Sequence, residues 1–390
     1  MTTQIRTYNA ISPTGLDRLP ADTYTVGNDF EAPDAVLVRS ANLHAAPLPE
    51  SVLAVARAGA GTNNIPVADL SRRGVPVFNT PGANANAVKE LVLAGLLIAA
   101  RNICPAVAFA RDLSGDDATI SAAVEAGKKQ FVGFELPGRT LGVIGLGAIG
   151  VQVANSALAL GMRVLGFDPQ ITVRHAWQLS SGVEQAASLE DLFTRSDAIT
   201  VHVPLLDATR GLVNAQRLAL MKPGSVVLNF ARAGIVDEPA VLDALDAGTL
   251  RSYVCDFPTS RSRGHEGVVA IPHLGASTGE AEENCAVMAV DTLRSFLEQG
   301  TIRNSVNFPE ARLPRSAGTT RIAIANSNVP NMVGQISTLL ATENLNIADL
   351  LNKSRGEVAY TLIDVQGGVP EGLLDRIKSI PGVLTARTIG

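Results

Sequence analysis

Three glycines, Gly145, Gly147 and Gly150, stand between an apolar strand pattern and a helix pattern rich in alanine and leucine. In this G-x-G-x-x-G spacing the first glycine permits a tight turn, and the second lets the backbone approach a pyrophosphate. The third lets the helix pack closely on the strand, and the helix N-terminus offers free amides and a positive dipole to phosphates. The stretch therefore predicts a strand–turn–helix unit that binds a dinucleotide.

An acidic residue follows at the end of the next strand pattern, where Asp168 stands 18 residues after Gly150. A carboxylate at this position can accept hydrogen bonds from the adenosine ribose hydroxyls, and it repels a 2′-phosphate. NAD is therefore the expected cofactor rather than NADP, although Arg174 nearby is a residue type that tolerates the additional phosphate. In the alternative interpretation, Asp168 only opens an Asp-Pro turn.

Short apolar runs alternate with helical patterns along most of the 390 residues, a length that suggests about two to four domains. This alternation favours an α/β fold with a parallel, doubly wound sheet. A buried helix is expected within 91–100, and a long helix with an acidic start is expected over 279–299. Strands are expected at 35–38, 52–56, 75–78, 163–167, 198–203, 225–230, 252–255 and 268–271.

The pattern changes toward the C-terminal end. Residues 304–320 carry proline, glycine and serine without periodicity, which predicts a linker. After it come a strand, a helix, two strands joined by a turn at Arg355-Gly356, a helix over 370–379 and a last strand. This βαββαβ order predicts a compact module of its own.

Three polar residues, Arg232, Asp256 and His273, each follow closely on an apolar strand pattern. Because ligands in open α/β sheets bind outside the carboxyl ends of the strands, all three are expected at one edge with the glycine turn. His273 can exchange a proton near neutral pH, Arg232 can bind a carboxylate, and Asp256 can reach the nicotinamide end of the cofactor. Alternatively, His273 is a helix-capping or loop histidine, and Arg232 forms a surface ion pair.

Composition limits the class and compartment of the protein. Hydrophobic residues make up 46% and the net charge is −5 without basic runs, which argues for a globular protein and against a nucleic-acid binder. The three cysteines show no metal-ligand spacing, so we expect no metal site and a reducing, cytoplasmic location. No signal segment opens the sequence and the apolar run 91–100 is too short to span a bilayer, so no membrane partner is expected.

Four stretches together resemble the D-isomer-specific 2-hydroxyacid dehydrogenases. They are GLGAIG at 145–150, HVPLLDAT at 202–209, NFARAGIVDE at 229–238 and IPHLGAST at 271–278. Three upstream stretches, at 38–43, 57–65 and 79–90, are similar to the members that act on D-3-phosphoglycerate. The tail from Arg321 resembles the ACT regulatory domain of those members, so the resemblance spans nearly the whole chain.

The resemblance implies three domains. A substrate-binding domain of flavodoxin-like α/β fold would combine residues 1–86 with a returning segment over 284–312. An NAD-binding Rossmann domain would cover 87–283, and an ACT regulatory domain would cover 319–390.

It also implies residue roles, in which Arg232 and His273 match a catalytic arginine and an acid–base histidine. The positions that match substrate contacts are Arg39, Ser40, Gly59 and Asn84. The positions that match cofactor contacts are Gly145, Gly147, Ala148, Ile149, Gly150, Asp168, His202, Val203, Pro204, Thr209, Phe230, Ala231, Arg232, Asp256, His273, Leu274, Gly275 and Ala276.

One departure concerns the partner of the histidine. In the family, a glutamate a few residues after the strand-end aspartate pairs with it, but Ser260 stands in that place here. Glu266 is the one acidic residue between Asp256 and His273, so we expect it to pair with His273 in a catalytic role. A paired carboxylate would fix the imidazole tautomer and stabilise its protonated form. Alternatively, Glu266 is a solvated loop acid.

A second departure lies in the tail. Asn326, Asn328 and Asn346 match effector positions that can hold serine, with Asn326 in place of a histidine. L-serine is therefore the expected effector, and the alternative is a module that only helps assembly. The resemblance also implies a homodimer or homotetramer.

The implied reaction is the NAD-dependent oxidation of D-3-phosphoglycerate to 3-phosphohydroxypyruvate, the first step of serine biosynthesis. One alternative is the same chemistry on another D-2-hydroxy acid, which would make less use of Arg39. Another alternative, from a different class, is a non-catalytic nucleotide-sensing protein, which would need neither Arg232 nor His273.

Overall fold

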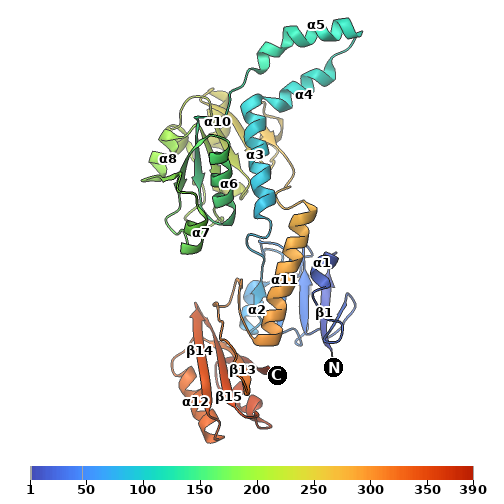
Figure 1. The fold of residues 1–390 in the computed structure, drawn as a ribbon, viewed down its shortest axis with the longest axis vertical. Helices are drawn as coiled ribbons and strands as arrows, with labels where there is room; N and C mark the ends of the chain where they lie inside the picture. Colours follow the sequence, from blue (N-terminus) through green and yellow to red (C-terminus); the bar gives the residue numbers. More distant parts are fainter. Residues whose placement is uncertain (1, 46, 390) are drawn as a thin grey trace. The chain divides into compact units, whose positions relative to one another are not determined.

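The structure, a computed structural model, describes residues 2–45 and 47–389 (Figure 1). By its internal contacts the chain divides into two compact units. Unit 1 combines Met1–Ala83 with Gly279–Gly390, and unit 2 is the intervening segment Asn84–Thr278. The chain therefore leaves unit 1 and later returns to it, while the finer division into three domains stays a prediction.

Unit 2 is built around a seven-stranded sheet in which all neighbouring strands are parallel. The strands are β6 (Thr140–Ile144), β7 (Arg163–Phe167), β8 (Val183–Gln185), β9 (Ala198–Val201), β10 (Ser225–Asn229), β11 (Leu250–Cys255) and β12 (Val268–Ala270). Their order is β12-β11-β10-β9-β6-β7-β8, so the direction of progression reverses between β6 and β9. Doubly wound sheets bind ligands at such a reversal, and the predicted parallel α/β sheet is confirmed.

Helices cover both faces of this sheet. They are α3 (Ala85–Arg101), α6 (Ala148–Ala159), α7 (Val173–Gln178), α8 (Leu189–Arg195), α9 (Ala215–Leu218) and α10 (Glu238–Asp246). Consecutive strand residues point to opposite faces, so Val143 packs in one core with Val92 of α3 and Ile144 packs in another with Phe193 of α8. Leu96 of α3 is fully buried, which confirms the predicted buried helix.

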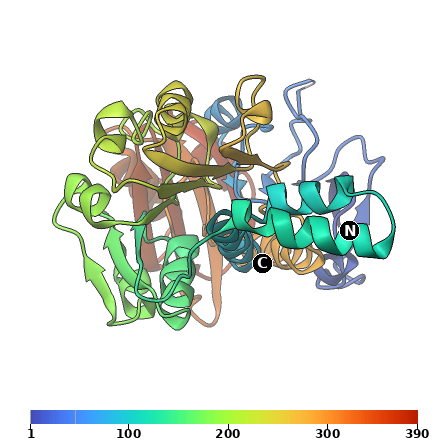
Figure 2. The same ribbon diagram turned by 90° about the horizontal axis from the view of Figure 1, so that it is seen from above.

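A helical hairpin follows α3. It consists of α4 (Ile103–Asp112), α5 (Asp117–Gly127) and the 3-10 helix η1 (Lys128–Phe131), and α3 and α4 meet at Asn102 with a φ of 51°. Neither α4 nor α5 contains a buried residue, and Figures 1 and 2 show the two helices joined as a hairpin beyond α3. Among the described residues, no single helix is long and apolar enough to cross a membrane, and α3 and α4 reach that length only as a pair bent by 64°.

The first sheet of unit 1 has five parallel strands in the flavodoxin-like order β2-β1-β3-β4-β5. They are β1 (Thr3–Tyr8), β2 (Tyr24–Gly27), β3 (Ala35–Val38), β4 (Ala54–Arg57) and β5 (Val77–Phe78). The expected long helix is confirmed as α11 (Gly279–Gln299), which packs on one face of the sheet through Leu293. The short helix α1 (Pro13–Leu16) packs beside α11 on the same face, and α2 (Val67–Arg72) buries Leu70 on the other face.

The C-terminal module of unit 1 has the predicted βαββαβ order. Its elements are β13 (Thr319–Ser327), α12 (Met332–Thr342), β14 (Ile347–Arg355), β15 (Val358–Gln366), α13 (Leu373–Lys378) and β16 (Val383–Ile389). The strands form an antiparallel sheet in the order β14-β15-β13-β16. Ile322 and Ile324 share a core with the two helices, whereas Ala323 and Ala325 pack in the cluster that contains Phe296 of α11. The module therefore has its own core and a second apolar contact with the rest of unit 1.

The segment expected to be a linker is irregular but packed. It contains no helix or strand before Thr319, yet Phe308 and Ala311 are each only 1% exposed and belong to the core of unit 1. An isolated bridge pairs Ile302 with Ala311, which holds the segment against the end of α11. The proline-rich sequence prevents regular structure, but its apolar side chains still find a buried surface.

Candidate active site

The carboxyl edge of the unit 2 sheet brings predicted residues together in order. Because β12, β11 and β10 are adjacent and parallel, His273, Asp256 and Arg232 follow neighbouring strands. His202 follows β9, and the glycine turn follows β6, across the reversal point. Neighbouring strands lie about 4.8 Å apart, so these groups form one row along the edge.

The glycine turn has no room for side chains at two of its positions. A Cβ at Gly145, whose φ is 90°, would lie 2.6 Å from the His202 carbonyl oxygen, and one at Gly150 would lie 1.9 Å from the Gly145 oxygen. At Gly147 no heavy atom lies within 4 Å of a built Cβ, so this backbone is open to a ligand. No side chain caps the N-terminus of α6, which begins at Ala148 and Ile149. These features fit the pyrophosphate of a dinucleotide.

Asp168 fastens the glycine turn to the end of β7. Its Oδ2 accepts a hydrogen bond from the Leu146 amide at 2.9 Å, and its Oδ1 accepts one from the Gln170 amide at 2.9 Å. The carboxylate is therefore placed beside the turn, with remaining lone pairs that suit ribose hydroxyls.

Asp256 is a buried carboxylate without a hydrogen-bond partner. It is 1% exposed, and neither oxygen is bonded within the part of the chain that the structure describes. Burial raises the pKa of its carboxyl, and the charge of His273, the nearby backbone amides of Asp256 and Gly275, and the charge of Arg232 oppose that rise. A buried polar group without a partner costs stability, so a ligand that donates to Asp256 would be favoured. The orphan oxygens fit a cofactor amide at this edge.

Arg232 and His273 both reach solvent on either side of Asp256 along the edge. The Asn229 side chain braces the turn that carries Arg232, because it donates to the Arg232 carbonyl at 2.9 Å and accepts from the Ala231 amide at 3.1 Å. The ring of His273 packs against Phe257, with centroids 4.9 Å apart. The catalytic roles of Arg232 and His273 stay predictions.

The loop before β12 is held by contacts with α10 that were not predicted from the sequence. Thr259 donates to Glu238 at 2.7 Å, and the Nε2 atom of His265 lies 3.1 Å from Asp246. Glu266 is exposed, and among the residues that the structure describes it makes no hydrogen bond or ion pair. The expected pairing of Glu266 with His273 stays a prediction.

His202, which follows β9 in this row, is a neutral group. Its Nε2 atom is 2.9 Å from the Thr200 hydroxyl, and burial lowers the pKa of His202 from 6.5 to about 3. The loop that follows is closed by Thr209, whose hydroxyl donates to the Pro204 carbonyl at 2.6 Å and accepts from the Leu206 amide at 2.8 Å. Val203 packs with the core beneath the loop.

The other predicted cofactor positions flank the row. Phe230 is 5% exposed and packs in the core that contains Val92, whereas Ala231 is half-buried and packs against the core on the other face of the sheet. After His273, Gly275 is buried with its built Cβ 3.7 Å from Asp256 Oδ2, while Leu274 and Ala276 are exposed.

Arg39 and Ser40 follow β3 at the reversal point of the unit 1 sheet. Asn9, which follows β1, was not predicted from the sequence. Its side chain accepts from the Ser40 amide at 3.0 Å and the Ala41 amide at 2.6 Å, so it shapes this turn.

The remaining predicted substrate positions are Gly59 and Asn84. A Cβ at Gly59 would lie 3.3 Å from the Arg57 guanidinium carbon, so this glycine leaves room for that side chain. Asn84 stands directly before α3 in unit 2.

The three predicted effector residues do not converge within one chain. Asn326 and Asn328 lie at the end of β13, where Asn328 donates to the Gly356 carbonyl at 3.0 Å. Asn346 precedes β14 at the opposite end of the sheet and donates to Gln366 at 3.0 Å. Asn326 is buried and donates to the Ser327 carbonyl.

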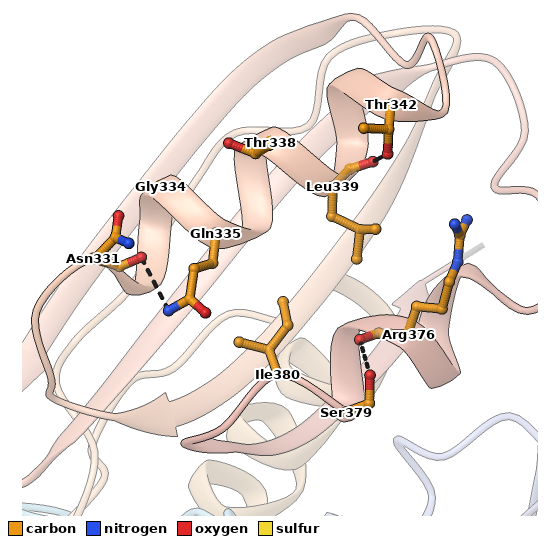
Figure 3. A pocket seen from close by; sticks show the side chains of 9 residues that line it. All are labelled: Asn331, Gly334, Gln335, Thr338, Leu339, Thr342, Arg376, Ser379 and Ile380. Carbon is orange, nitrogen blue, oxygen red and sulfur yellow. Dashed lines mark hydrogen bonds between the residues drawn. The ribbon is translucent and has the colours of Figure 1, made fainter.

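A shallow pocket of about 580 Å³, not predicted from the sequence, lies between α12 and α13 (Figure 3). Leu339 and Ile380 form its floor between polar residues. Arg376 at its rim is paired with Glu343 at 2.6 Å.

A doubly wound dinucleotide sheet whose edge carries an arginine, an aspartate and a histidine is the architecture of a nicotinamide-dependent dehydrogenase. No group of three or more histidine, cysteine or acidic residues among the described ones could hold a metal ion.

Comparison with known proteins identifies the family. Residues 103–275 match the D-isomer specific 2-hydroxyacid dehydrogenase, NAD binding domain. The D-3-phosphoglycerate dehydrogenase of Haemophilus influenzae is 33% identical over 341 residues, which cover 84% of this chain and 79% of the relative. That of Escherichia coli K12 is 32% identical over 353 residues, 87% and 82% of the two chains. This chain belongs to the D-isomer specific 2-hydroxyacid dehydrogenase family, and its cofactor is NAD.

A solved structure shows the same fold. The NAD⁺-bound 3-phosphoglycerate dehydrogenase of Entamoeba histolytica aligns with a TM-score of 0.61 and 24% identity, over 78% of this chain and 99% of that one.

Proposed function

We propose that this chain oxidises D-3-phosphoglycerate to 3-phosphohydroxypyruvate with NAD, the first step of serine biosynthesis. The observation that carries the proposal is that Arg232, Asp256 and His273 follow three adjacent strands, at the same edge as the glycine turn. The D-3-phosphoglycerate dehydrogenases that share about a third of its residues over most of the chain support the choice of substrate.

Each residue of the row has a distinct task in the proposed reaction. When bound, NAD supplies the acceptor for the hydride that leaves the hydroxyl-bearing carbon. His273 takes the hydroxyl proton, because an exposed imidazole can exchange it with solvent. Arg232 binds the carboxylate and polarises the forming carbonyl, and Asp256 accepts a hydrogen bond from the cofactor amide.

The phosphate end of the substrate requires further cationic and polar groups. We assign it to Arg39 and Ser40, at the reversal point of the unit 1 sheet, together with Asn84. A guanidinium, a hydroxyl and an amide suit phosphate oxygens, and ligands of doubly wound sheets bind at such reversal points.

We also propose that the C-terminal module is an ACT regulatory domain. Its βαββαβ order and antiparallel sheet support this assignment. Because Asn328 and Asn346 lie at opposite ends of one sheet, L-serine bound by both would require residues from two copies.

We propose that the protein is a homo-oligomer in the cytoplasm. The α4–α5 hairpin supports the first part, because it buries no residue of its own and exposes Val107 and Val124. The free state of all three cysteines supports a reducing compartment.

The test is an absorbance assay of NADH formation with 3-phosphoglycerate, 2-hydroxyglutarate and lactate in parallel. We expect 3-phosphoglycerate to give the highest kcat/KM. His273→Asn should lower kcat by at least about a hundredfold, since a general base contributes this much or more, while NADH affinity changes little. Equal activity of His273→Asn, or preference for lactate, would contradict the proposal.

A further inference from the structure

The carboxylate of Glu282 is paired with the guanidinium of Arg39. The two side chains form a hydrogen-bonded ion pair between Nη2 and Oε1, and both are about two-fifths exposed. Arg39 follows β3, whereas Glu282 lies in the first turn of α11. The residue assigned to the substrate phosphate is therefore already paired with a carboxylate of its own unit.

The helix face of α11 explains why Glu282 is in this place. Cys285, Ala286 and Ala289 stand three, four and seven residues later, so they share its side of the helix, and all three are buried in the core of unit 1. Glu282 continues this buried stripe beyond the core to the carboxyl edge of the sheet. Packing of α11 thus fixes the carboxylate opposite Arg39.

The hydrogen bonds that fix the main chain around Arg39 do not fix its guanidinium. Arg57 Nε donates to the Arg39 carbonyl at 2.9 Å, and Asn9 accepts from the amides of Ser40 and Ala41. These bonds do not involve the Arg39 guanidinium. An incoming anion can therefore exchange with Glu282 without rebuilding the turn.

The Glu282 carboxylate is also stabilised when Arg39 binds another anion. It belongs to the acidic first turn of α11, where the helix dipole stabilises a carboxylate. Release of Glu282 from Arg39 consequently costs little, which is a requirement for a reversible competitor.

We propose that Glu282 competes with the substrate phosphate for Arg39 and thereby raises the KM for phosphorylated substrates, without affecting substrates that lack a charged end. A phosphate dianion can displace one carboxylate from the guanidinium, whereas a hydroxyl or methyl end gains nothing by doing so. The inference rests on the proposed function, since it assumes that Arg39 binds the phosphate, and it makes Glu282 a specificity-determining residue.

The test compares Glu282→Gln with Glu280→Gln, which removes an equal charge from the same turn. Glu280 is exposed. For Glu282→Gln we expect KM for 3-phosphoglycerate to fall about three- to fivefold, the size of an exposed ion pair, with kcat unchanged. KM for D-glycerate should not move, and Glu280→Gln should match the wild type on both substrates.

An unchanged or higher KM for 3-phosphoglycerate in Glu282→Gln would overturn the inference, because Glu282 would then be neutral or would position Arg39 for binding. Calorimetric titration of 3-phosphoglycerate into NADH-saturated protein gives a Kd for the wild type and for Glu282→Gln without turnover. The ratio of the two Kd values should match the expected ratio of the KM values. If the wild type produced no NADH from 3-phosphoglycerate, the proposed function would fail, and the Kd ratio would still decide on Glu282. If 3-phosphoglycerate bound neither the wild type nor any variant, both the proposed function and the inference on Glu282 would be overturned.

Discussion

Arg321 and Asp364 form a buried two-point ion pair between β13 and β15, with Nε–Oδ1 and Nη2–Oδ2 distances of 2.7 Å. Their side chains are 1% and 0% exposed. Arg321 also donates to the carbonyls of Gln299 at 3.0 Å and Pro314 at 3.3 Å. The pair therefore caps the end of α11 and joins the C-terminal module to the rest of unit 1.

Removal of the Asp364 charge should destabilise unit 1. Burial alone would raise the pKa of the Asp364 carboxyl, but the hydrogen bonds and charge of Arg321 hold it below its ordinary value. We expect Asp364→Asn to lower the free energy of unfolding by about 3–5 kcal/mol, because Arg321 is left as a buried, uncompensated charge. Urea unfolding followed by circular dichroism measures this loss.

The sign of the pH dependence follows from the lowered pKa. The contribution of Asp364 is present above the ordinary aspartate pKa of about 3.9 and is lost as the pH falls through its folded value. Asp375→Asn, in an exposed pair with Lys378, is the matched control and should cost no more than about 1 kcal/mol. A similarly small loss in Asp364→Asn would contradict the capping role.

The positions of Arg232, Asp256 and His273 at the sheet edge could be predicted because they depend only on local sequence patterns. A polar residue after an apolar run lies at the carboxyl end of a strand, and parallel strands place these ends together, so His273, Asp256 and Arg232 needed no knowledge of tertiary contacts. Strand β1 had a weaker signal, since TQIRTY buries only Ile5 completely and shows no apolar run. The position of each element was easier to predict than the contacts of its side chains.

The missed contacts join residues far apart in sequence. Arg39 and Glu282 are separated by 243 positions, and their pairing depends on how α11 returns to the first sheet. The loop from Phe257 to Gly267 has no periodicity, and bonds to Glu238 and Asp246 of α10 hold it. Neither arrangement leaves a pattern in the local sequence.

Asp256→Asn should stabilise the protein without cofactor and weaken cofactor binding. The folded-state pKa of Asp256 is raised, mainly by burial, so its charge costs stability at every pH above the ordinary value of about 3.9. At about pH 7 we expect a gain of about 1–3 kcal/mol in the mutant, the cost of an unsatisfied buried group. Thermal unfolding of the cofactor-free protein measures it.

NADH affinity should fall about tenfold in the same mutant, because a hydrogen bond to a charged acceptor becomes one to a neutral oxygen. Titration by NADH fluorescence checks this. A cofactor-free Asp256→Asn protein less stable than the wild type would show that the carboxylate has a stabilising partner.

His202 should stay neutral between about pH 6.5 and 5. Because burial lowers the pKa of His202 to about 3, the folded chain takes up no proton there between about pH 6.5 and 5, whereas the unfolded chain does. Stability should therefore fall by about 1–2 kcal/mol over this interval, and His202→Asn should abolish that loss. With five histidines in the chain, ¹⁵N NMR of the imidazoles resolves the titration directly. A His202 signal that shifts within the interval would refute the assignment.

The α4–α5 hairpin should be the contact of a homo-oligomer. Val107 on α4 and Val124 on α5 are 50% and 40% exposed, and neither helix has a buried residue, so the hairpin lacks the packing that stabilises helices of this length. We expect Val107→Asp with Val124→Asp to lower the molar mass in light scattering to that of a smaller assembly, without loss of NADH binding. Val173→Asp, at a 74% exposed valine on α7, is the control that introduces the same charge elsewhere and should leave the mass unchanged. An unaltered mass in the double mutant would place the oligomer contact on another surface, because two buried aspartates would each cost several kcal/mol at an apolar interface.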